Sequence, residues 1–443
     1  MNNGRSLRFL LINPTAPRWR VPPGGVASAA TRFFRFSMLS SLYVAAALPP
    51  DVTPTIADEE IEAIDFDADA DLVGISFMTF NAPRAYEIAD RFRAAGKTVV
   101  VGGYHPSLLP DEAQQHADCV CVGEAEGTVP QMIADFRRGE LKDRYVAGPV
   151  SLAGLPVPDR SLVRVGRYAP AAAVQATRGC PNTCSFCSIT SFFHHRFRTR
   201  PVDEVIAELR TLGRHLLFMD DNLTANRAYA LALFERMQPL RKTWFSQCSI
   251  RIAYDDRLLA AAAASGCRGL FIGLESLSQD NLAGWNKKTN KASEFEWAIR
   301  RIHDHGIGVV PGIVLGYDGD TRRTFDETLE FLLRTNVDAL QATILTPFPG
   351  TPLFAEMERQ GRIVDRDWSH YDFRHVVFEP KQVSAAELQA GHDRVLSEFY
   401  SLKNSARRFV REVAYLPLGL IAKAAIPLNF SYRTRLTADG TMH

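Results

Sequence analysis

The sequence predicts an α/β protein: an N-terminal doubly wound parallel sheet, then a partial barrel of six βα units, then a small and mainly helical C-terminal region. Short apolar runs alternate with helical patterns over residues 1–145, and the alternation resumes with a different rhythm over residues 171–360. Polar side chains directly follow the apolar runs of the second stretch, at the edge where parallel α/β folds build their sites. A chain of 443 residues that is 46% hydrophobic and 23% charged can bury a core in each part.

The N-terminal domain, residues 1–145, is expected to be an open parallel sheet. Its buried strands are the short apolar runs at 8–13, 72–77, 98–101 and 119–122. Helical periodicity covers residues 33–48 and 82–95. Four prolines interrupt residues 146–170, which indicates a linker to the second domain.

The second domain, residues 171–360, is expected to alternate strands with helices. Its strands are expected at 172–177, 216–220, 245–250, 270–273, 309–315 and 340–346. Helical patterns separate them, for example at 202–212, 228–237 and 324–334. A complete eight-unit barrel takes about 250 residues, so this shorter stretch predicts a partial one.

Residues 361–443 are expected to be mainly helical. A helix is predicted over residues 383–402 with Ser384 as its N-cap. The stretch 409–430 is apolar but is interrupted by charged residues and prolines, and arginines precede it. Such a segment indicates either peripheral contact with a membrane surface or a terminal helix packed on the barrel, and we favour packing.

The net charge and the number and spacing of the cysteines exclude several classes of protein. Lys and Arg total 51 against 50 Asp and Glu, so the net charge of +1 gives no electrostatic basis for nucleic-acid binding. The seven cysteines are odd in number and three lie close together, unlike the disulfide framework of a small secreted protein. The sequence shows no signal-peptide pattern and no run of about 18 apolar residues. We therefore expect a protein of the reducing cytoplasm.

Three cysteines, Cys180, Cys184 and Cys187, share one loop with the spacing Cys-x3-Cys-x2-Cys. Thiolates that converge from one loop select soft metals, so an iron–sulfur cluster, zinc or Cu(I) is expected here. A four-iron cluster with three protein ligands leaves one iron open to another molecule. A structural zinc site closes with four ligands, and His194 or His195 could provide the fourth. The isolated cysteines are expected to be buried small hydrophobes: Cys119, Cys121, Cys248 and Cys267.

The motif Cys-x3-Cys-x-aromatic-Cys, after the first strand of a six-unit barrel, resembles that of the radical S-adenosylmethionine (radical SAM) superfamily. The resemblance implies a [4Fe–4S] cluster on the three cysteines, with its open iron chelated by the amino and carboxylate groups of SAM. Phe186 matches the aromatic residue that packs near the adenine in that family. Asp220, Asp221 and Asn222 follow the second strand, where the family places the groups that hold the SAM ammonium.

Later strands carry the other SAM contacts that the resemblance implies. Glu275 follows the fourth strand at a position that commonly contacts the ribose. Ile313 and Gly316 belong to a glycine-spaced fifth strand that lies against the adenosyl group. Arg251, charged at a strand end, is either a further site residue or a solvated rim charge. Glu275 and Asn222 also have a structural alternative, because either could cap the helix that follows.

An open parallel sheet in front of such a barrel resembles the cobalamin-binding radical SAM enzymes. Glycines directly after the third and fourth strands would let a macrocycle or its nucleotide tail approach backbone N–H groups. The cobalamin contacts implied by this resemblance are Thr79, Gly102, Gly103, His105, Gly123 and Glu124. The Asp-x-His-x-x-Gly motif that supplies an axial histidine in many cobalamin folds is absent, so His105 is expected to be a turn or rim residue. A degenerate domain that only supports the barrel is the alternative.

The resemblance also implies a reaction. Reductive cleavage of SAM would give a 5′-deoxyadenosyl radical that removes hydrogen from an unactivated carbon, and cobalamin would deliver a methyl group. The expected substrate is a natural-product or lipid-like small molecule, and flavodoxin or ferredoxin is the expected electron donor. No motif indicates which residues contact the substrate. Oxidative cyclisation or rearrangement without methyl transfer is the alternative enzyme function, and a non-catalytic zinc scaffold is the alternative outside enzymes.

Overall fold

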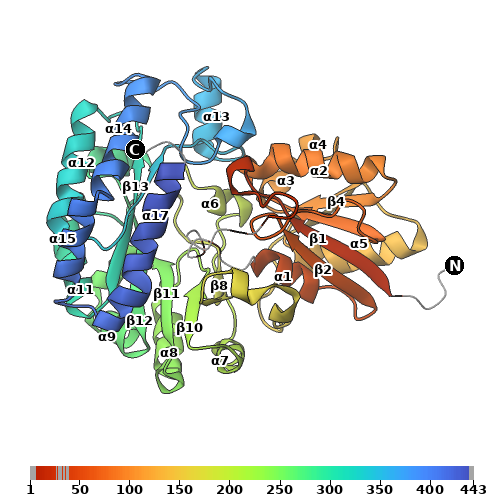
Figure 1. Cartoon of the computed structure of the whole chain (residues 1–443), viewed down its shortest axis with the longest axis horizontal. Helices are drawn as coiled ribbons and strands as arrows, with labels where there is room; N and C mark the ends of the chain where they lie inside the picture. Colours follow the sequence, from red (N-terminus) through yellow and green to blue (C-terminus); the bar gives the residue numbers. More distant parts are fainter. Residues whose placement is uncertain (1–5, 26, 28–31, 33–34, 36–38, 439–443) are drawn as a thin grey trace.

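The computed structural model describes residues 6–25, 27, 32, 35 and 39–438, which form two parallel sheets and a helical C-terminal region. Figure 1 shows the N-terminal sheet on one side of the molecule and the barrel sheet on the other, with the short helix α6 (Ser188–Phe192) between them. This arrangement confirms the α/β class predicted from the sequence.

The N-terminal sheet has six parallel strands in the order β2-β1-β3-β4-β5-β6. The strands are β1 (Leu7–Asn13), β2 (Val52–Asp58), β3 (Leu72–Ser76), β4 (Thr98–Gly102), β5 (Cys119–Gly123) and β6 (Arg144–Ala147). The connecting helices are α1 (Leu39–Ala46), α2 (Ala82–Ala94), α3 (Tyr104–Leu108), α4 (Pro110–Ala113) and α5 (Ala125–Arg138). Helix α2 packs on one face, and α1 and α5 pack on the other, so the central strands are apolar throughout. The predicted helix over 33–48 lies partly outside the described residues.

Neither edge strand of this sheet, β2 or β6, is among the strands expected from the sequence. Strand β2 contains Pro54 and alternates in burial, and β6 is short and leaves Val146 71% exposed. Edge strands tolerate proline and exposed side chains because only one of their sides pairs with a neighbour. The continuous apolar run that marks a buried parallel strand is therefore missing at both edges.

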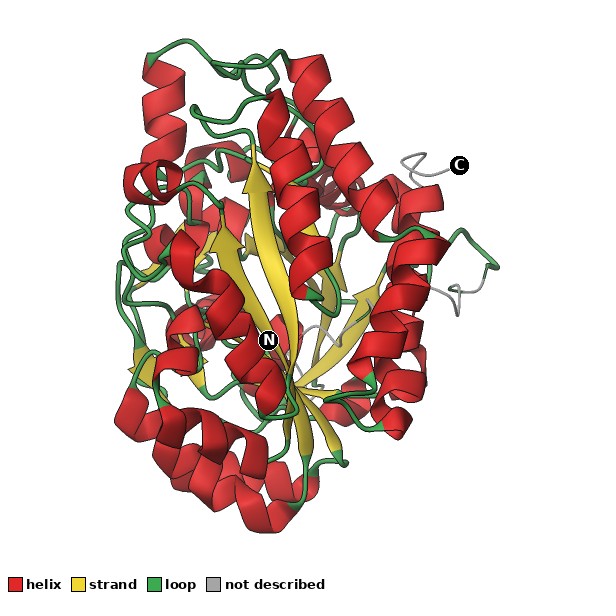
Figure 2. Ribbon diagram, turned by 90° about the vertical axis from the view of Figure 1, so that its left-hand side faces the viewer, coloured by secondary structure: helices red, strands yellow, loops and turns green. Residues whose placement is uncertain are grey.

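The barrel sheet also has six parallel strands, in the order β14-β13-β12-β11-β10-β7, and forms a half-barrel. The strands are β7 (Ala172–Val174), β10 (His215–Phe218), β11 (Thr243–Cys248), β12 (Cys267–Glu275), β13 (Gly308–Leu315) and β14 (Gln341–Ile344). The helices between and after them are α7 (Val202–Thr211), α8 (Arg227–Met237), α9 (Asp256–Ala264), α10 (Gln279–Gly284), α11 (Phe295–Asp304), α12 (Arg322–Thr335) and α13 (Pro352–Arg359). Figure 2 shows these helices flanking the strands.

The first predicted barrel strand, 172–177, is divided in the structure. Strand β7 ends at Val174, and the chain enters a short antiparallel hairpin of β8 (Thr177–Arg178) and β9 (Arg198–Thr199). The Asp220 carboxylate accepts hydrogen bonds from the N–H groups of Ala176 and Thr177 and from the Thr177 hydroxyl, which lies 2.6 Å away. A side chain thus replaces the neighbouring strand as the hydrogen-bond acceptor and turns the chain out of the sheet.

The segment between the sheets, 146–170, is fastened to both domains. A guanidinium nitrogen of Arg160 lies 2.6 Å from Glu208 on α7 of the barrel. The hydroxyl of Tyr168 donates to Asp58, at the end of β2, over 2.8 Å. The segment predicted to be a linker is therefore packed along both domains.

The C-terminal helices pack on the barrel. Helix α14 (Ala385–Phe399) begins with the predicted cap, because the Ser384 hydroxyl accepts from the N–H of Glu387. Helices α15 (Leu402–Glu412), α16 (Leu418–Leu420) and α17 (Ile426–Ala438) follow, with a π-helical turn, η10 (Ile421–Ala425), between the last two. Leu436 belongs to the main apolar core. No helix in the described part of the chain has both the length and the apolar character needed to cross a membrane.

Candidate functional site

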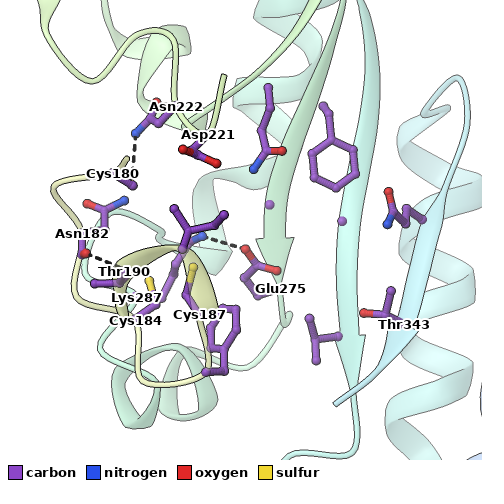
Figure 3. A pocket seen from close by; sticks show the side chains of 18 of the residues that line it. Cys180, Asn182, Cys184, Cys187, Thr190, Asp221, Asn222, Glu275, Lys287 and Thr343 are labelled. Atoms are coloured by element: carbon purple, nitrogen blue, oxygen red, sulfur yellow. Dashed lines mark hydrogen bonds and ion pairs between the residues drawn. The ribbon is translucent and has the colours of Figure 1, made fainter. Parts of the chain in front are cut away.

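A cavity of about 280 Å³ opens at the carboxyl ends of the barrel strands. Its walls come from β11 to β14, from the loop between β8 and α6 that carries the three cysteines, and from segments after β14. Figure 3 shows Cys184, Cys187 and Lys287 close together on one side, Glu275 facing them, and Thr343 on the opposite side. Parallel α/β folds build their sites at this edge, so the cavity is the candidate functional site.

The cysteine loop is held in place by its neighbours. Gly179 has a φ of +83°, and a Cβ at this position would come within 2.0 Å of the Arg196 carbonyl oxygen, so only glycine fits there. The N–H of Gly179 donates to a carboxylate oxygen of Asp221 over 2.8 Å. The Cys180 sulfur lies 3.8 Å from the side-chain nitrogen of Asn222. The two residues after β10 that border the cavity therefore also position the first cysteine.

All three predicted metal-ligating cysteines line the cavity. Burial raises the pKa of the Cys184 thiol to about 11 and also raises the pKa of Cys187, so a metal must displace protons to bind them. Among the described residues, no three His, Cys, Asp or Glu side chains stand close enough to hold one metal ion. The ligands of a four-iron cluster bind separate iron atoms and need only border a common space, as these thiols do.

The histidines of the zinc alternative lie elsewhere. His194 and His195 are exposed after α6, in left-handed conformations with φ of 50° and 59°, and neither lines the cavity. A structural zinc site closes with a fourth ligand, which neither imidazole is placed to supply. Three thiols beside an open cavity instead fit a [4Fe–4S] cluster with one iron left for SAM.

Five of the eight residues predicted to contact SAM line the cavity: Phe186, Asp221, Asn222, Glu275 and Ile313. The ring of Phe186 packs edge-on against Trp285, with centroids 5.2 Å apart. Burial raises the pKa of Asp221 to about 6. Carboxylate and amide oxygens beside apolar walls fit a molecule that carries an ammonium group, ribose hydroxyls and a flat base.

The other three predicted SAM contacts do not line the cavity. The Asp220 carboxylate instead accepts hydrogen bonds from the N–H of Ala176 and from the Thr177 hydroxyl, at the start of β8. Arg251 is exposed beyond β11, which matches the alternative of a solvated rim charge. Gly316 has a φ of +106°, and a Cβ there would come within 2.6 Å of Leu388, so its small size serves packing against α14.

Glu275 reaches the cavity through an irregularity in β12. The register between β12 and β13 shifts between Gly273 and Glu275, and Glu275 has a φ of 67°. Such a bulge re-aims a side chain at the cost of local strain. The carboxylate is turned toward Lys287, whose ammonium nitrogen lies 2.6 Å away. Glu275 does not cap the following helix, because Ser278 caps α10 through the N–H of Asn281.

Several residues around the cavity have no signal in the sequence. Lys287 is the first of two consecutive lysines, and burial alone separates it from its exposed neighbour Lys288. Asn290 donates to the carbonyl oxygens of Gly273 and Leu274 over 2.9 and 3.0 Å. The apolar wall comes from several separate segments: Phe271, Val314, Leu345, Phe348 and Phe373. Single residues from distant segments leave no periodic pattern, so only the tertiary fold brings them together.

The predicted cobalamin contacts lie at the carboxyl edge of the N-terminal sheet. A Cβ on Gly103, which has a φ of +101°, would come within 2.8 Å of the Phe77 carbonyl oxygen. A Cβ on Gly123, at φ +90°, would come within 2.1 Å of the Ala147 carbonyl oxygen. Both glycines are required by the backbone at the strand ends, whereas Gly102 has ordinary contacts only. The edge therefore presents backbone rather than side chains at these two turns.

The remaining three predicted cobalamin contacts are buried: Thr79, His105 and Glu124. The Nε2 atom of His105 lies 3.0 Å from the Tyr86 hydroxyl and 3.1 Å from a Glu112 oxygen. These contacts turn the imidazole into its own domain, and His105 is fully buried in α3 rather than at the rim expected from the sequence.

The same edge faces the cysteine loop of the barrel. Glu124, directly after β5, forms ion pairs with Arg178 at 2.9 Å and Arg198 at 2.6 Å, on the hairpin that encloses the cysteines. Tyr104, at the start of α3, packs on Phe192 of α6 with ring centroids 4.3 Å apart. Open α/β sheets bind flat cofactors at this edge, and here it stands against the mouth of the barrel. The arrangement fits cobalamin held next to SAM.

Each of the two domains matches a known protein family. Residues 174–332 match the Radical SAM superfamily, and residues 30–133 match the B12 binding domain. Bacteriochlorophyllide d C-12(1)-methyltransferase of Chlorobaculum tepidum is 31% identical over 89% of this chain and 87% of its own length. Hopanoid C-2 methylase of Rhodopseudomonas palustris is 27% identical over 89% of this chain and 74% of its own. An anaerobic magnesium-protoporphyrin IX monomethyl ester cyclase of Cereibacter sphaeroides is 26% identical over 75% of this chain and 60% of its own.

Two solved structures share the fold. The radical SAM methyltransferase TsrM from Kitasatospora setae, with cobalamin and a [4Fe–4S] cluster bound, has a TM-score of 0.63 and 18% identity, over 80% of this chain and 78% of its own. The cobalamin-dependent SAM radical enzyme OxsB, with aqua-cobalamin and SAM bound, has a TM-score of 0.67 and 14% identity, over 99% of this chain and 72% of its own. At these identities the likeness is one of fold.

Proposed function

The chain belongs to the radical SAM enzymes that carry a B12-binding domain, and on that premise we propose that it methylates a carbon atom of an apolar, ring-containing small molecule. Its cofactors are a [4Fe–4S] cluster, SAM and cobalamin. One observation carries the proposal: the cysteine loop and the candidate SAM contacts border one cavity, and the carboxyl edge of the N-terminal sheet faces that loop.

When bound, the cluster and SAM supply a radical that removes hydrogen from carbon, and cobalamin supplies the methyl group. The residues of the chain hold and orient these groups. In our proposal the three cysteines of the loop bind the cluster, Asp221 and Asn222 bind the ammonium of SAM, and Glu275 binds its ribose. Phe186 and Ile313 pack against the adenosyl group. The apolar wall excludes water, which would otherwise provide routes for side reactions.

The lining of the cavity supports an apolar substrate. Among the described lining residues, the only charged side chains are Asp221, Glu275 and Lys287, and Figure 3 draws them near the cysteines. The remaining wall is apolar or neutral, so an ionised group placed against it would find no side chain of opposite charge. Two relatives are named for bacteriochlorophyllide d and hopanoids, which are ring systems with large apolar surfaces. We infer a substrate of that kind.

Anaerobic reconstitution tests the proposal. The full chain is loaded with iron, sulfide and hydroxocobalamin and incubated with SAM, a reductant and a panel of tetrapyrrole and triterpenoid substrates. We expect optical spectra of both cofactors, cleavage of SAM, and a product heavier by one methylene unit. A chain that binds zinc and contains no acid-labile sulfide would contradict the proposal.

A cysteine substitution locates the cluster. Cys184→Ala removes one of three ligands, so we expect loss of bound iron and a fall of at least about a hundredfold in SAM cleavage. Cys267→Ala is the matched control, because Cys267 is buried on β12 and does not line the cavity. The control should keep its iron and its cleavage rate. Equal iron content in the two variants would contradict the assignment of the loop.

Oxidative cyclisation without methyl transfer is the second candidate function. It is favoured by one observation, the 26% identity to the anaerobic magnesium-protoporphyrin IX monomethyl ester cyclase. Product mass separates the two reactions, because cyclisation removes hydrogen or adds oxygen whereas methylation adds one methylene unit.

We also propose that the chain works in the reducing cytoplasm with flavodoxin or ferredoxin as electron donor, because thiolate ligands require a reducing environment. Peripheral contact with a membrane is testable at two exposed C-terminal side chains, Leu418 and Phe430, which are 68% and 52% exposed. Co-sedimentation with liposomes that is lost in Leu418→Ser/Phe430→Ser would support the contact. Equal partitioning of the two proteins would rule it out.

A further inference from the structure

Lys287 lies inside the candidate site although no motif predicts it. It follows α10 and is the only Lys, Arg or His among the described residues that line the cavity. Its side chain is 15% exposed, and its ammonium nitrogen lies 2.6 Å from an oxygen of Glu275. In Figure 3 the side chain lies beside Cys184 and Cys187. Burying an ammonium group costs desolvation free energy, so the position of Lys287 beside the cysteines needs a compensating interaction.

The surrounding backbone leaves room for this ion pair. A Cβ on Gly273 would come within 2.1 Å of a Glu275 carboxylate oxygen and within 3.3 Å of the Lys287 nitrogen, so any larger residue would displace the pair. Asn290 binds the carbonyl oxygens of Gly273 and Leu274 and pins the strand at this point. The bulge at the end of β12 then aims the Glu275 carboxylate at Lys287. Gly273, Asn290 and the bulge in β12 therefore all contribute to the ion pair between Glu275 and Lys287.

The charge on Lys287 acts on the cysteines as well as on Glu275. Lys287, Cys184 and Cys187 all line the cavity, and Figure 3 shows the three side chains close together, with Glu275 paired to Lys287. A positive charge in this position favours negative charge on the sulfurs beside it.

We propose that Lys287 is a charge-compensating residue that raises the reduction potential of the cluster held by the cysteine loop, with Glu275 partly offsetting it; this inference rests on the proposed function. Reduction adds one electron to the cluster, and a buried cation nearby stabilises the added negative charge. Net charge around the cysteine ligands is one of the factors that set the potential of such clusters. Lys287 would therefore make one-electron transfer from a flavin or iron–sulfur donor more favourable.

Redox titration followed by electron paramagnetic resonance tests this role in the reconstituted full-length protein without SAM. We expect Lys287→Met to lower the ratio of reduced to oxidised cluster at a fixed dithionite-set potential at least tenfold, which is a 59 mV negative shift for a one-electron couple. Lys287→Arg keeps the charge and should stay near the wild-type potential. Lys288→Met is the matched control, because its side chain is exposed next to Lys287. That control should leave the potential unchanged.

Glu275→Gln gives an independent test with the opposite sign. Removing the carboxylate leaves Lys287 uncompensated, so the potential should become more positive. Iron content and circular dichroism establish that each variant is folded and loaded. A fully loaded Lys287→Met protein with the wild-type potential would overturn the inference, as would a negative shift in Glu275→Gln. Neither result would touch the proposed function, which fails instead if the wild-type chain assembles no cluster.

Discussion

Asp220 and Asp221 are adjacent carboxylates after β10 that serve different parts of the structure. Asp220 accepts hydrogen bonds from the backbone of Ala176 and Thr177 and shapes the hairpin that carries the cysteines. Asp221 borders the cavity and accepts from the N–H of Gly179. Burial raises the pKa of Asp220 to about 7 and that of Asp221 to about 6. The pair therefore divides into a residue that shapes the loop and a residue that lines the cavity.

Alanine substitution should separate these two roles. Asp220→Ala leaves the N–H groups of Ala176 and Thr177 without their acceptor, so we expect a loss of about 3–5 kcal/mol in the free energy of unfolding. Asp221→Ala removes one hydrogen bond within the protein and should cost about 1 kcal/mol, but it should weaken SAM binding about tenfold. Urea unfolding and calorimetric SAM titration measure the two effects. Equal losses of stability in the two variants would contradict the division.

Individual residues are predictable from the sequence when neighbouring positions carry the signal. The three cysteines lie within one loop, and their spacing alone indicates a metal site. Lys287 has no such signal, because Lys288 is the same residue type one position later and only burial distinguishes them. Phe373 lines the cavity from a segment far beyond the last barrel strand. Its role depends on how the chain returns to the barrel mouth, which local patterns do not encode.

At the scale of helices and strands, apolar periodicity predicts the buried strands. It does not predict irregularities that depend on contacts with other segments of the chain. The bulge at the end of β12 exists only in relation to β13, so nothing in its own sequence marks it. The early end of β7 is likewise caused by a carboxylate from a later segment. Both irregularities position site residues, which is where local rules are expected to fail.

Helix α15 ends in a buried carboxylate, that of Glu412. Glu412 is fully buried, and within the described structure neither of its carboxylate oxygens has a hydrogen-bond partner. Arg408, one turn earlier on the same helix, donates instead to the Phe399 carbonyl oxygen, to the Ser405 hydroxyl and to Asn429. Burial, reinforced by the nearby charge of Asp338, raises the pKa of Glu412 to about 8 despite the opposing effect of Arg408. The folded protein therefore holds this carboxyl group protonated near neutral pH.

This shift makes stability depend on pH. The carboxyl group of Glu412 binds a proton more tightly in the folded chain than at its usual pKa of 4.5, so folding takes up a proton between about pH 4.5 and 8. Stability should fall as the pH rises through that window, with a contribution of at most about 1.4 kcal/mol per pH unit. We expect Glu412→Gln to flatten this dependence in urea unfolding at pH 6, 7 and 8. Glu398→Gln, at an exposed position on α14, is the control and should keep the wild-type slope.

At the scale of the whole molecule, charged groups join the two domains next to the cysteine loop. Arg178 lies 2.6 Å from Glu126 and 2.9 Å from Glu124, and Arg198 also pairs with Glu124. These side chains are 5–16% exposed, so breaking one pair leaves a charge without its partner in a poorly solvated place. Arg178 is two residues before Cys180. The contact therefore connects the edge proposed to bind cobalamin directly to the loop proposed to bind the cluster.

Weakening this contact should uncouple the two half-reactions while each domain remains folded. Glu124→Gln removes the charge shared by Arg178 and Arg198, whereas Glu126 still holds Arg178, so the barrel should keep its cluster and its cleavage of SAM. Misplacement of reacting groups by about 1 Å can cost on the order of a hundredfold in rate, so we expect the yield of methylated product per SAM cleaved to fall about ten- to a hundredfold. Glu140→Gln, at an exposed position after α5, should leave that ratio unchanged. If Glu124→Gln lost SAM cleavage and methylation in equal proportion, the ion pairs would serve the cysteine loop itself rather than the alignment of the two domains.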